Sequence, residues 1–146
     1  MRNMAGSILV RDAMTRSVKT VETVDTVDEA VEKMNKFNIG SVLVMNKERT
    51  RPVGIVTERD ILRLVERYPE PSLVKVKQIM SQPLVTIPVD ASIEEAARLM
   101  ARKQVKRLPV IEQDKLVGIV SSSDLMRAGP KLVRVLIDLL PAEDRS

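Results

Sequence analysis

The sequence predicts an α+β fold, in which two β-α-β-β-α repeats pack as a pseudo-two-fold pair and a short C-terminal helix follows. The first observation is a motif that occurs twice, from Val53 to Asp60 and, 64 residues later, from Val117 to Asp124. Each copy is an apolar run with an internal glycine, then Thr or Ser, then Asp three positions on. The sequence upstream also repeats, at an offset of 66 residues. The two-residue difference falls in a polar loop, as expected of a structural repeat.

The sequence predicts the same elements in the same order in both repeats. A linker, at residues 10–17 or 76–83, leads into an extended segment. A helix follows, with a capping box at Thr26 or Ser92 and apolar residues at helical spacing behind it. A strand, a polar hairpin loop, the doubled motif and a last helix complete the repeat. Pro109 predicts an edge or strand-start position. The expected extended segments and strands are residues 18–21, 41–45 and 53–56 in the first repeat and 84–87, 107–111 and 117–120 in the second.

The predicted domains are residues 8–68 for the first repeat, 74–128 for the second and 130–141 for the C-terminal helix. Pro69 and Pro71 end the last helix of the first repeat. Units of this size bury little apolar surface alone, so the two repeats should pack on one another. The C-terminal segment is apolar nearly all round, and so short a helix needs a surface of the protein or of another subunit to pack on.

The composition excludes several kinds of chemistry. The chain has no Cys and no His, which removes thiol nucleophiles, histidine bases, zinc sites and disulfides together. It has one Phe, one Tyr and no Trp, which disfavours recognition of nucleic acid by base stacking. No segment approaches 18 consecutive apolar residues and the N-terminus lacks a signal-peptide core. A cytoplasmic protein without a membrane anchor is therefore expected.

The doubled motif itself suggests a ligand site. Its internal glycine indicates a buried strand that another group approaches closely. Its hydroxyl residue, Thr57 or Ser121, is a natural N-cap, so a strand runs into a helix start that suits a phosphate. Asp60 or Asp124 could accept hydrogen bonds from ribose hydroxyls. The alternative is that each Ser/Thr-x-x-Asp is only a capping box.

These residues resemble a tandem pair of CBS domains, often called a Bateman module. The resemblance covers residues 8–128 and is carried by the doubled Gly-x-x-Ser/Thr-x-x-Asp, by Asp12-Ala13-Met14 with its echo Gln78-Ile79-Met80, and by Arg107-Leu108-Pro109-Val110. It implies binding of an adenosine compound (AMP, ADP, ATP or S-adenosylmethionine, with or without Mg²⁺) in two clefts between the repeats. It also implies regulation of an enzyme, channel or transporter, here a separate and unidentified protein.

The resemblance assigns residues to both clefts. The first would combine Arg107, Ile119, Ser121 and Asp124 with Thr20, Ile39 and Gly40. The second would combine Ser41, Ile55, Thr57 and Asp60 with Thr86, Val105 and Lys106. In both, aspartate binds ribose, the hydroxyl residue binds phosphate or ribose, the aliphatic residues enclose the purine, and Arg107 or Lys106 contacts phosphate. We expect the Asp124 cleft to bind more tightly, because Arg107 can make a bidentate contact and Gly40 leaves space.

The sequence is compatible with three functions. A regulatory module that binds adenine nucleotide is favoured, and a homodimer is expected because the helices after the two motifs would leave apolar faces exposed on a monomer. A small nucleotide-processing enzyme is the second possibility, but no paired carboxylates or activated nucleophile are found, so no catalytic or metal residues are predicted. The third is nucleic-acid binding through a net charge of +4, against which the interleaved acidic residues argue.

Overall fold

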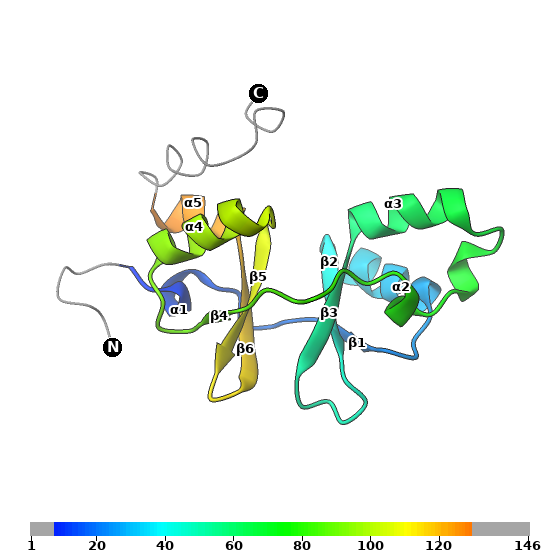
Figure 1. The fold of residues 1–146 in the computed structure, drawn as a ribbon, viewed down its shortest axis with the longest axis horizontal. Helices are drawn as coiled ribbons and strands as arrows, with labels where there is room; N and C mark the ends of the chain where they lie inside the picture. Colours follow the sequence, from blue (N-terminus) through cyan, green and yellow to red (C-terminus); the bar gives the residue numbers. More distant parts are fainter. Residues whose placement is uncertain (1–7, 130–146) are drawn as a thin grey trace. The chain divides into compact units, whose positions relative to one another are not determined.

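The computed structural model describes residues 8–129 of the 146-residue chain, so the predicted helix at 130–141 lies outside the described residues. The chain forms two compact units, each with a three-stranded sheet and helices. Unit 2 is Val18–Leu84, and unit 1 combines residues 8–17 with residues 85–129. The expected α+β fold of two similar repeats is confirmed (Figure 1).

Unit 2 contains the first repeat. Its sheet has the order β1-β2-β3, in which β1 is parallel and β3 antiparallel to the central strand. The helix α2 connects β1 to β2, and α3 follows β3 directly. Two 3₁₀ turns, η1 and η2, come after α3. The bounds are β1 Thr20–Glu22, α2 Val27–Phe37, β2 Ser41–Met45, β3 Pro52–Thr57, α3 Glu58–Arg67, η1 Pro71–Leu73 and η2 Val76–Gln78.

Unit 1 repeats this arrangement, with β4 parallel and β6 antiparallel to the central strand β5. The predicted edge position of Pro109 is wrong, because β5 lies between two strands. Proline is tolerated there because the short β4 pairs with β5 only from Val110 onward, and Pro109 faces β6 alone. The bounds are α1 Val10–Ala13, β4 Ile87–Pro88, α4 Ile93–Lys103, β5 Arg107–Glu112, β6 Lys115–Ser121 and α5 Ser122–Ala128.

The two long helices begin and end in the same way. The hydroxyls of Thr26 and Ser92 accept hydrogen bonds from the backbone N–H groups of Glu29 and Glu95, at 3.2 and 3.1 Å, which is the hydroxyl half of each predicted capping box. At the other ends, Asn38 and Gln104 adopt the left-handed conformation, with φ of 51° and 56°. That conformation turns the chain out of the helix and into the next strand.

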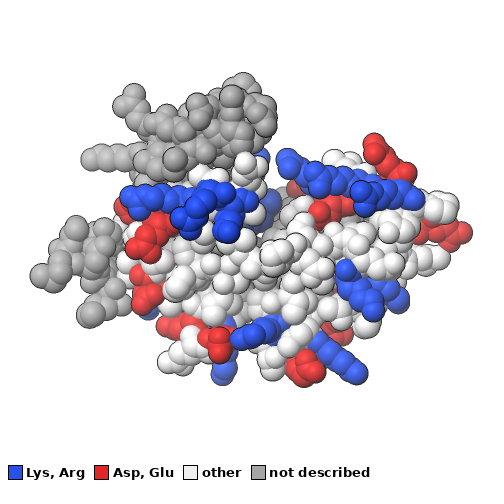
Figure 2. All heavy atoms as spheres, in the orientation of Figure 1, with Lys and Arg blue, Asp and Glu red and all other residues white. Residues whose placement is uncertain are grey.

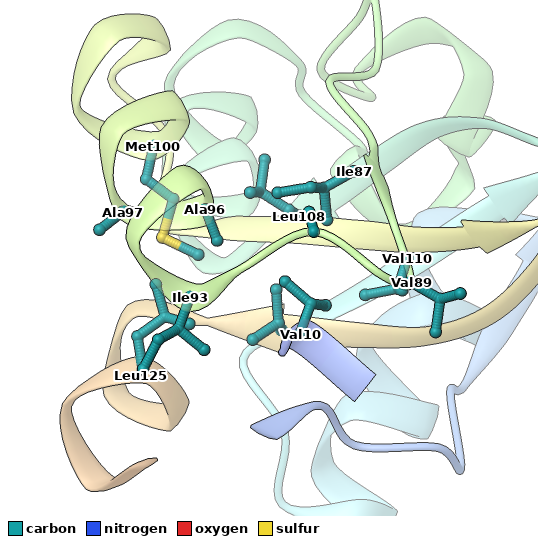
Figure 3. Packing of buried hydrophobic residues seen from close by; sticks show 12 residues of the cluster. Val10, Ile87, Val89, Ile93, Ala96, Ala97, Met100, Leu108, Val110 and Leu125 are labelled. Atoms are coloured by element: carbon teal, nitrogen blue, oxygen red, sulfur yellow. The ribbon is translucent and has the colours of Figure 1, made fainter. Parts of the chain in front are cut away.

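Each unit has its own core of aliphatic side chains. In unit 1, residues from α1, β4, α4, β5, β6 and α5 meet around Leu108 and Leu125, which are fully buried (Figure 3). In unit 2 the corresponding core is smaller and rich in valine, with Val42, Val44 and Val56 from the sheet against Ala30 and Met34 of α2. The near absence of aromatic residues is therefore compensated by close packing of small branched side chains.

The segment before each repeat packs on the other repeat's unit. Residues 8–17, including α1, belong to the unit that holds β6, and Thr15 bridges Ile119 with backbone hydrogen bonds of 2.8 and 2.9 Å. In the same way, Ser81 after η2 bridges Ile55 of β3, with bonds of 2.8 and 3.3 Å. These segments were expected to be linkers, but each extends the sheet of its unit at one residue and helps to bury the strand that carries the motif.

Candidate functional site

The two copies of the motif lie at equivalent strand-to-helix junctions, from β3 into α3 and from β6 into α5. At each junction the hydroxyl residue is the N-cap. Thr57 Oγ1 accepts from the N–H of Asp60 at 3.3 Å, and Ser121 Oγ accepts from the N–H of Asp124 at 3.1 Å. The aspartates accept in return from the N–H groups of Thr57 and Ser121, both at 2.9 Å. Each motif therefore forms a complete capping box.

The carboxylate of Asp60 is fully engaged within unit 2. The hydroxyl of Ser81 lies 3.1 Å from Oδ1 and 3.2 Å from Oδ2, and Thr57 Oγ1 lies 3.1 Å from Oδ2. Asp60 is 9% exposed, so these partners replace water around a nearly buried charge. A ligand that took either oxygen would have to displace an ordered protein group.

Asp124 is held more loosely. Its Oδ2 is fixed by Ser121, but its Oδ1 contacts only the guanidinium of Arg127, at 2.5 Å, among the described residues. The Arg127 side chain is 72% exposed. The Asp124 side chain is only 10% exposed, so a ligand hydroxyl that took the place of Arg127 would keep this carboxylate hydrogen-bonded while the guanidinium returned to water.

Protein groups already occupy part of each helix start. The first N–H of α3, from Glu58, donates to the carbonyl of Gly40 at 3.2 Å, and the first N–H of α5, from Ser122, donates to the carbonyl of Lys106 at 2.9 Å. Those bonds bring Gly40 beside the Thr57 motif and Lys106 beside the Ser121 motif. The capping hydroxyl takes the third N–H, so each start offers fewer free donors to a phosphate than the sequence suggests.

The remaining candidates fall on both units. In unit 2, Ser41 pairs with Thr57 in the sheet and Ile55 lies two residues before it, while Ile39 closes α2 through its N–H to Met34. In unit 1, Arg107 pairs with Ser121, and Ile119 lies on the same strand. Val105 closes α4 in the way Ile39 closes α2, and Thr86 directly precedes β4. Each unit therefore holds the aspartate, the hydroxyl residue and the isoleucine of its own motif, together with one β-strand neighbour of the hydroxyl residue.

Three partners of the candidate residues were missed from the sequence. Lys33 Nζ donates to the carbonyl of Thr20 at 2.7 Å, so that backbone oxygen is already bound. Ser81 lies 21 residues from Asp60, and no local sequence pattern predicts their contact. Arg127 could have been found, because it lies three residues after Asp124, on the same face of a helix.

A hollow of about 470 Å³ lies next to one predicted site residue. It is lined by Thr20 together with Val18, Lys19, Glu29, Glu32, Lys33, Lys36 and Phe37, all from unit 2. The ammonium group of Lys19 lies 4.2 Å from the centre of the Phe37 ring, a cation–π contact that covers part of this half-exposed aromatic side chain.

The chain belongs to the CBS domain family. The model of that family matches it twice, at residues 10–67 and 76–131, so the chain is a CBS-domain pair and the resemblance seen in the sequence is confirmed. Within residues 8–129, none of the helices has the length and apolar character needed to cross a bilayer.

Two relatives show the extent of the similarity. The uncharacterized protein MK0525 of Methanopyrus kandleri is 37% identical over 132 residues, which cover 89% of this chain and 67% of that protein. The CBS domain-containing protein YhcV of Bacillus subtilis is 36% identical over 116 residues, which cover 80% of this chain and 81% of that one.

Solved structures share the fold. An uncharacterized conserved protein from Pyrococcus horikoshii has a TM-score of 0.75 and 33% identity, covering 84% of this chain and 92% of its own. The CBS domain pair of protein MJ0100, solved in complex with 5′-methylthioadenosine and S-adenosyl-L-methionine, has a TM-score of 0.76 over 86% of this chain and 98% of its own. Its identity is 24%, so this likeness concerns the fold.

Proposed function

We propose that the chain is a regulatory module that binds an adenosine compound through the two capping-box aspartates and signals the bound state to a separate protein. The observation that carries the proposal is the environment of Asp124. The capping box fixes one oxygen of its carboxylate and thereby orients the other, which only an exposed arginine contacts among the described residues. A preoriented acceptor of this kind suits the vicinal hydroxyls of a ribose.

The other assignments follow the same chemistry. Ile39, Ile55, Val105 and Ile119 would enclose the purine, and Thr20 and Thr86 would meet its polar edge through the backbone. Arg107 and Lys106 would contact phosphate, and Arg107 is the stronger candidate because guanidinium binds phosphate oxygens in pairs. Thr57 and Ser121 lie at the strand-to-helix junctions, and Gly40 and Ser41 lie beside the junction at Thr57, so backbone and hydroxyl groups there could approach the ligand.

We expect a thermal-shift panel of AMP, ADP, ATP, S-adenosylmethionine, NAD and GTP to identify the ligand. A compound that binds only the folded state, at about 100 times its dissociation constant, adds roughly 2.7 kcal/mol to the free energy of unfolding. Such a gain raises the melting temperature by several degrees. Each nucleotide should be measured with and without Mg²⁺. If no adenosine compound moves the melting temperature of a ligand-free preparation, the proposed ligand class is wrong.

We further propose that the protein is a homodimer that associates through α3. Leu62 and Val65 lie three positions apart on this helix and are 71% and 61% exposed, which is unfavourable for aliphatic side chains on a lone subunit. Light scattering at micromolar concentration should give the mass of two chains. Leu62→Glu should give one chain, because it would bury a charge in the contact.

Val24→Glu serves as the matched control for the dimer, because Val24 is 60% exposed and lies before α2 rather than on α3. It should leave the mass of two chains unchanged. A single-chain mass for the unmodified protein, or equal dissociation by the two variants, would contradict association through α3.

A further inference from the structure

A second hollow lies in unit 2, beside the C-terminal half of α3. It measures about 150 Å³ and is lined by Asp60, Arg63, Leu64, Arg67, Tyr68, Gln78 and Ile79. Small-molecule sites usually measure about 300 to 1,000 Å³, so this hollow is too small for a nucleotide. It holds the volume of about five water molecules, which is enough for a tetrahedral oxoanion. Asp60 is its only member among the nucleotide-site residues assigned above.

Basic side chains gather along α3 (Figure 2). Arg59, Arg63 and Arg67 are spaced four residues apart and therefore lie on one face of the helix. Within residues 8–129, none of these three guanidinium groups forms an ion pair or a hydrogen bond. Like charges at this spacing destabilise a helix slightly, so a row of unpaired arginines has no structural benefit of its own. An anion between two of them would remove the repulsion.

The two repeats use their equivalent arginines differently. Arg127 follows Asp124 by three residues and is paired with its carboxylate. Arg63 follows Asp60 by the same three residues, but there Ser81 and Thr57 engage both carboxylate oxygens. The serine therefore takes the place that an arginine has in the other unit. Arg63 is left available, and it lines the hollow together with Arg67.

The other polar groups on the wall are hydrogen-bond donors. Gln78 uses its side-chain oxygen to accept from the N–H of Lys75 at 3.1 Å, which leaves its amide N–H groups to donate. Tyr68 contributes a phenol, which can donate as well. Asp60 is the one anionic group in the lining, against two arginines, so the lining carries a net positive charge. Guanidinium, amide and phenol donors around a small space match an oxoanion.

We propose that this hollow binds a phosphate or sulfate group, held by Arg63 and Arg67 and oriented by Gln78 and Tyr68. The group is either a free ion or the phosphoryl group of a small phosphomonoester, because both present the same oxygens to the arginines. The site requires no adenosine, and Asp60 is the one residue that it shares with the function proposed above. Asp124 lies in the other unit, so the Asp124→Ala variant is expected to bind phosphate with the affinity of the unmodified protein.

The test is an NMR titration of the arginine Nε–H signals in the full-length protein, with sodium phosphate at constant ionic strength. The signals of Arg63 and Arg67 should shift and reach saturation, while those of Arg59 stay in place. Arg63→Gln and Arg67→Gln should each weaken binding roughly tenfold, since one charge-assisted bond contributes about one factor of ten. Glycerol 2-phosphate in a parallel titration distinguishes the sources. Saturating shifts with glycerol 2-phosphate would indicate that the site binds phosphomonoesters, and their absence would indicate that it binds the free ion.

Arg59→Gln is the matched control, because it removes the same charge from the same helix without touching the hollow. Arg59→Gln should change the affinity for phosphate by less than about twofold. If phosphate were attracted only to the general charge of the basic helix, all three variants would lose affinity to the same extent. Circular dichroism confirms that the variants are folded. Shifts that do not saturate, or a loss of affinity in Arg59→Gln equal to that in Arg63→Gln, would overturn the proposal.

Discussion

Gly118→Ala is expected to lower the free energy of unfolding by about 3 kcal/mol, the upper part of the range for overpacked cores. A Cβ at Gly118 would lie 2.6 Å from Sδ of Met14 and 2.8 Å from the carbonyl oxygen of Thr15. The methionine can change rotamer, but the carbonyl accepts from the N–H of Ile119 at 2.9 Å and cannot move without breaking the bridge. Denaturant unfolding measures the change directly.

Gly54→Ala is the matched comparison, and it should cost about 1 kcal/mol or less. The three atoms nearest to a Cβ there all belong to the side chain of Met80, with Sδ at 2.5 Å, Cγ at 2.8 Å and Cβ at 3.1 Å. A flexible side chain can give way, and replacing glycine also restricts the unfolded chain, which offsets about 0.4–1 kcal/mol. Met80→Ala should therefore rescue Gly54→Ala, whereas Met14→Ala should not rescue Gly118→Ala. Equal costs at the two glycines would contradict this account.

The two glycines also show what a sequence pattern can predict. An apolar run with an internal glycine indicates that another group approaches the strand, and the structure confirms this at Gly54 and Gly118. The pattern does not say which group approaches. At both positions it is a methionine from the segment that precedes the other repeat, and so no ligand is needed to explain either glycine.

Local chemistry was predicted most accurately. The strand at residues 41–45 has the predicted bounds, and the hydroxyl caps at Thr26 and Ser92 are formed as expected. The extended segments were placed too early. Pairing begins only at Thr20 and Ile87, because a strand begins where a neighbour supplies hydrogen bonds rather than where β-branched residues first occur. Cap geometry depends on residues three positions apart, whereas strand ends depend on partners far along the chain.

Contacts between distant segments could not be predicted. The sequence predicts linkers at residues 10–17 and 76–83. In the structure, residues 10–17 contain α1 and pack in unit 1 with the second repeat, and residues 76–83 contain η2 and pack in unit 2 with the first repeat. No local sequence feature tells whether each segment packs with the repeat that follows it or with the other repeat. The Ser81 contact with Asp60 depends on the same pairing, which explains why the sequence presents Asp60 and Asp124 as equivalent although their surroundings differ.

The difference between the two aspartates leads to the second large effect. Asp124→Ala should abolish the tighter nucleotide-binding event, weakening it by at least about a hundredfold, since two charge-assisted hydrogen bonds to ribose are lost. Asp60→Ala should leave that event intact. In the free protein, Asp124 exchanges only an exposed arginine for the ligand, whereas Asp60 must give up the hydroxyl of Ser81. On the proposed assignment, Arg107, which pairs with Ser121 beside Asp124, would also bind phosphate in a bidentate contact.

Titration calorimetry with the ligand from the thermal panel decides between the two sites. Both substitutions remove a capping-box partner, so each variant is first checked by its unfolding curve. Asp60→Ala should be the less stable of the two, because it leaves the N–H of Thr57 and the hydroxyl of Ser81 without an acceptor near a nearly buried position. If an alanine variant does not fold, the Asn variant keeps an oxygen for the cap and still removes the charge. Greater loss of nucleotide affinity in the Asp60 variant than in the Asp124 variant would show that pairing with the exposed Arg127 does not mark the stronger site.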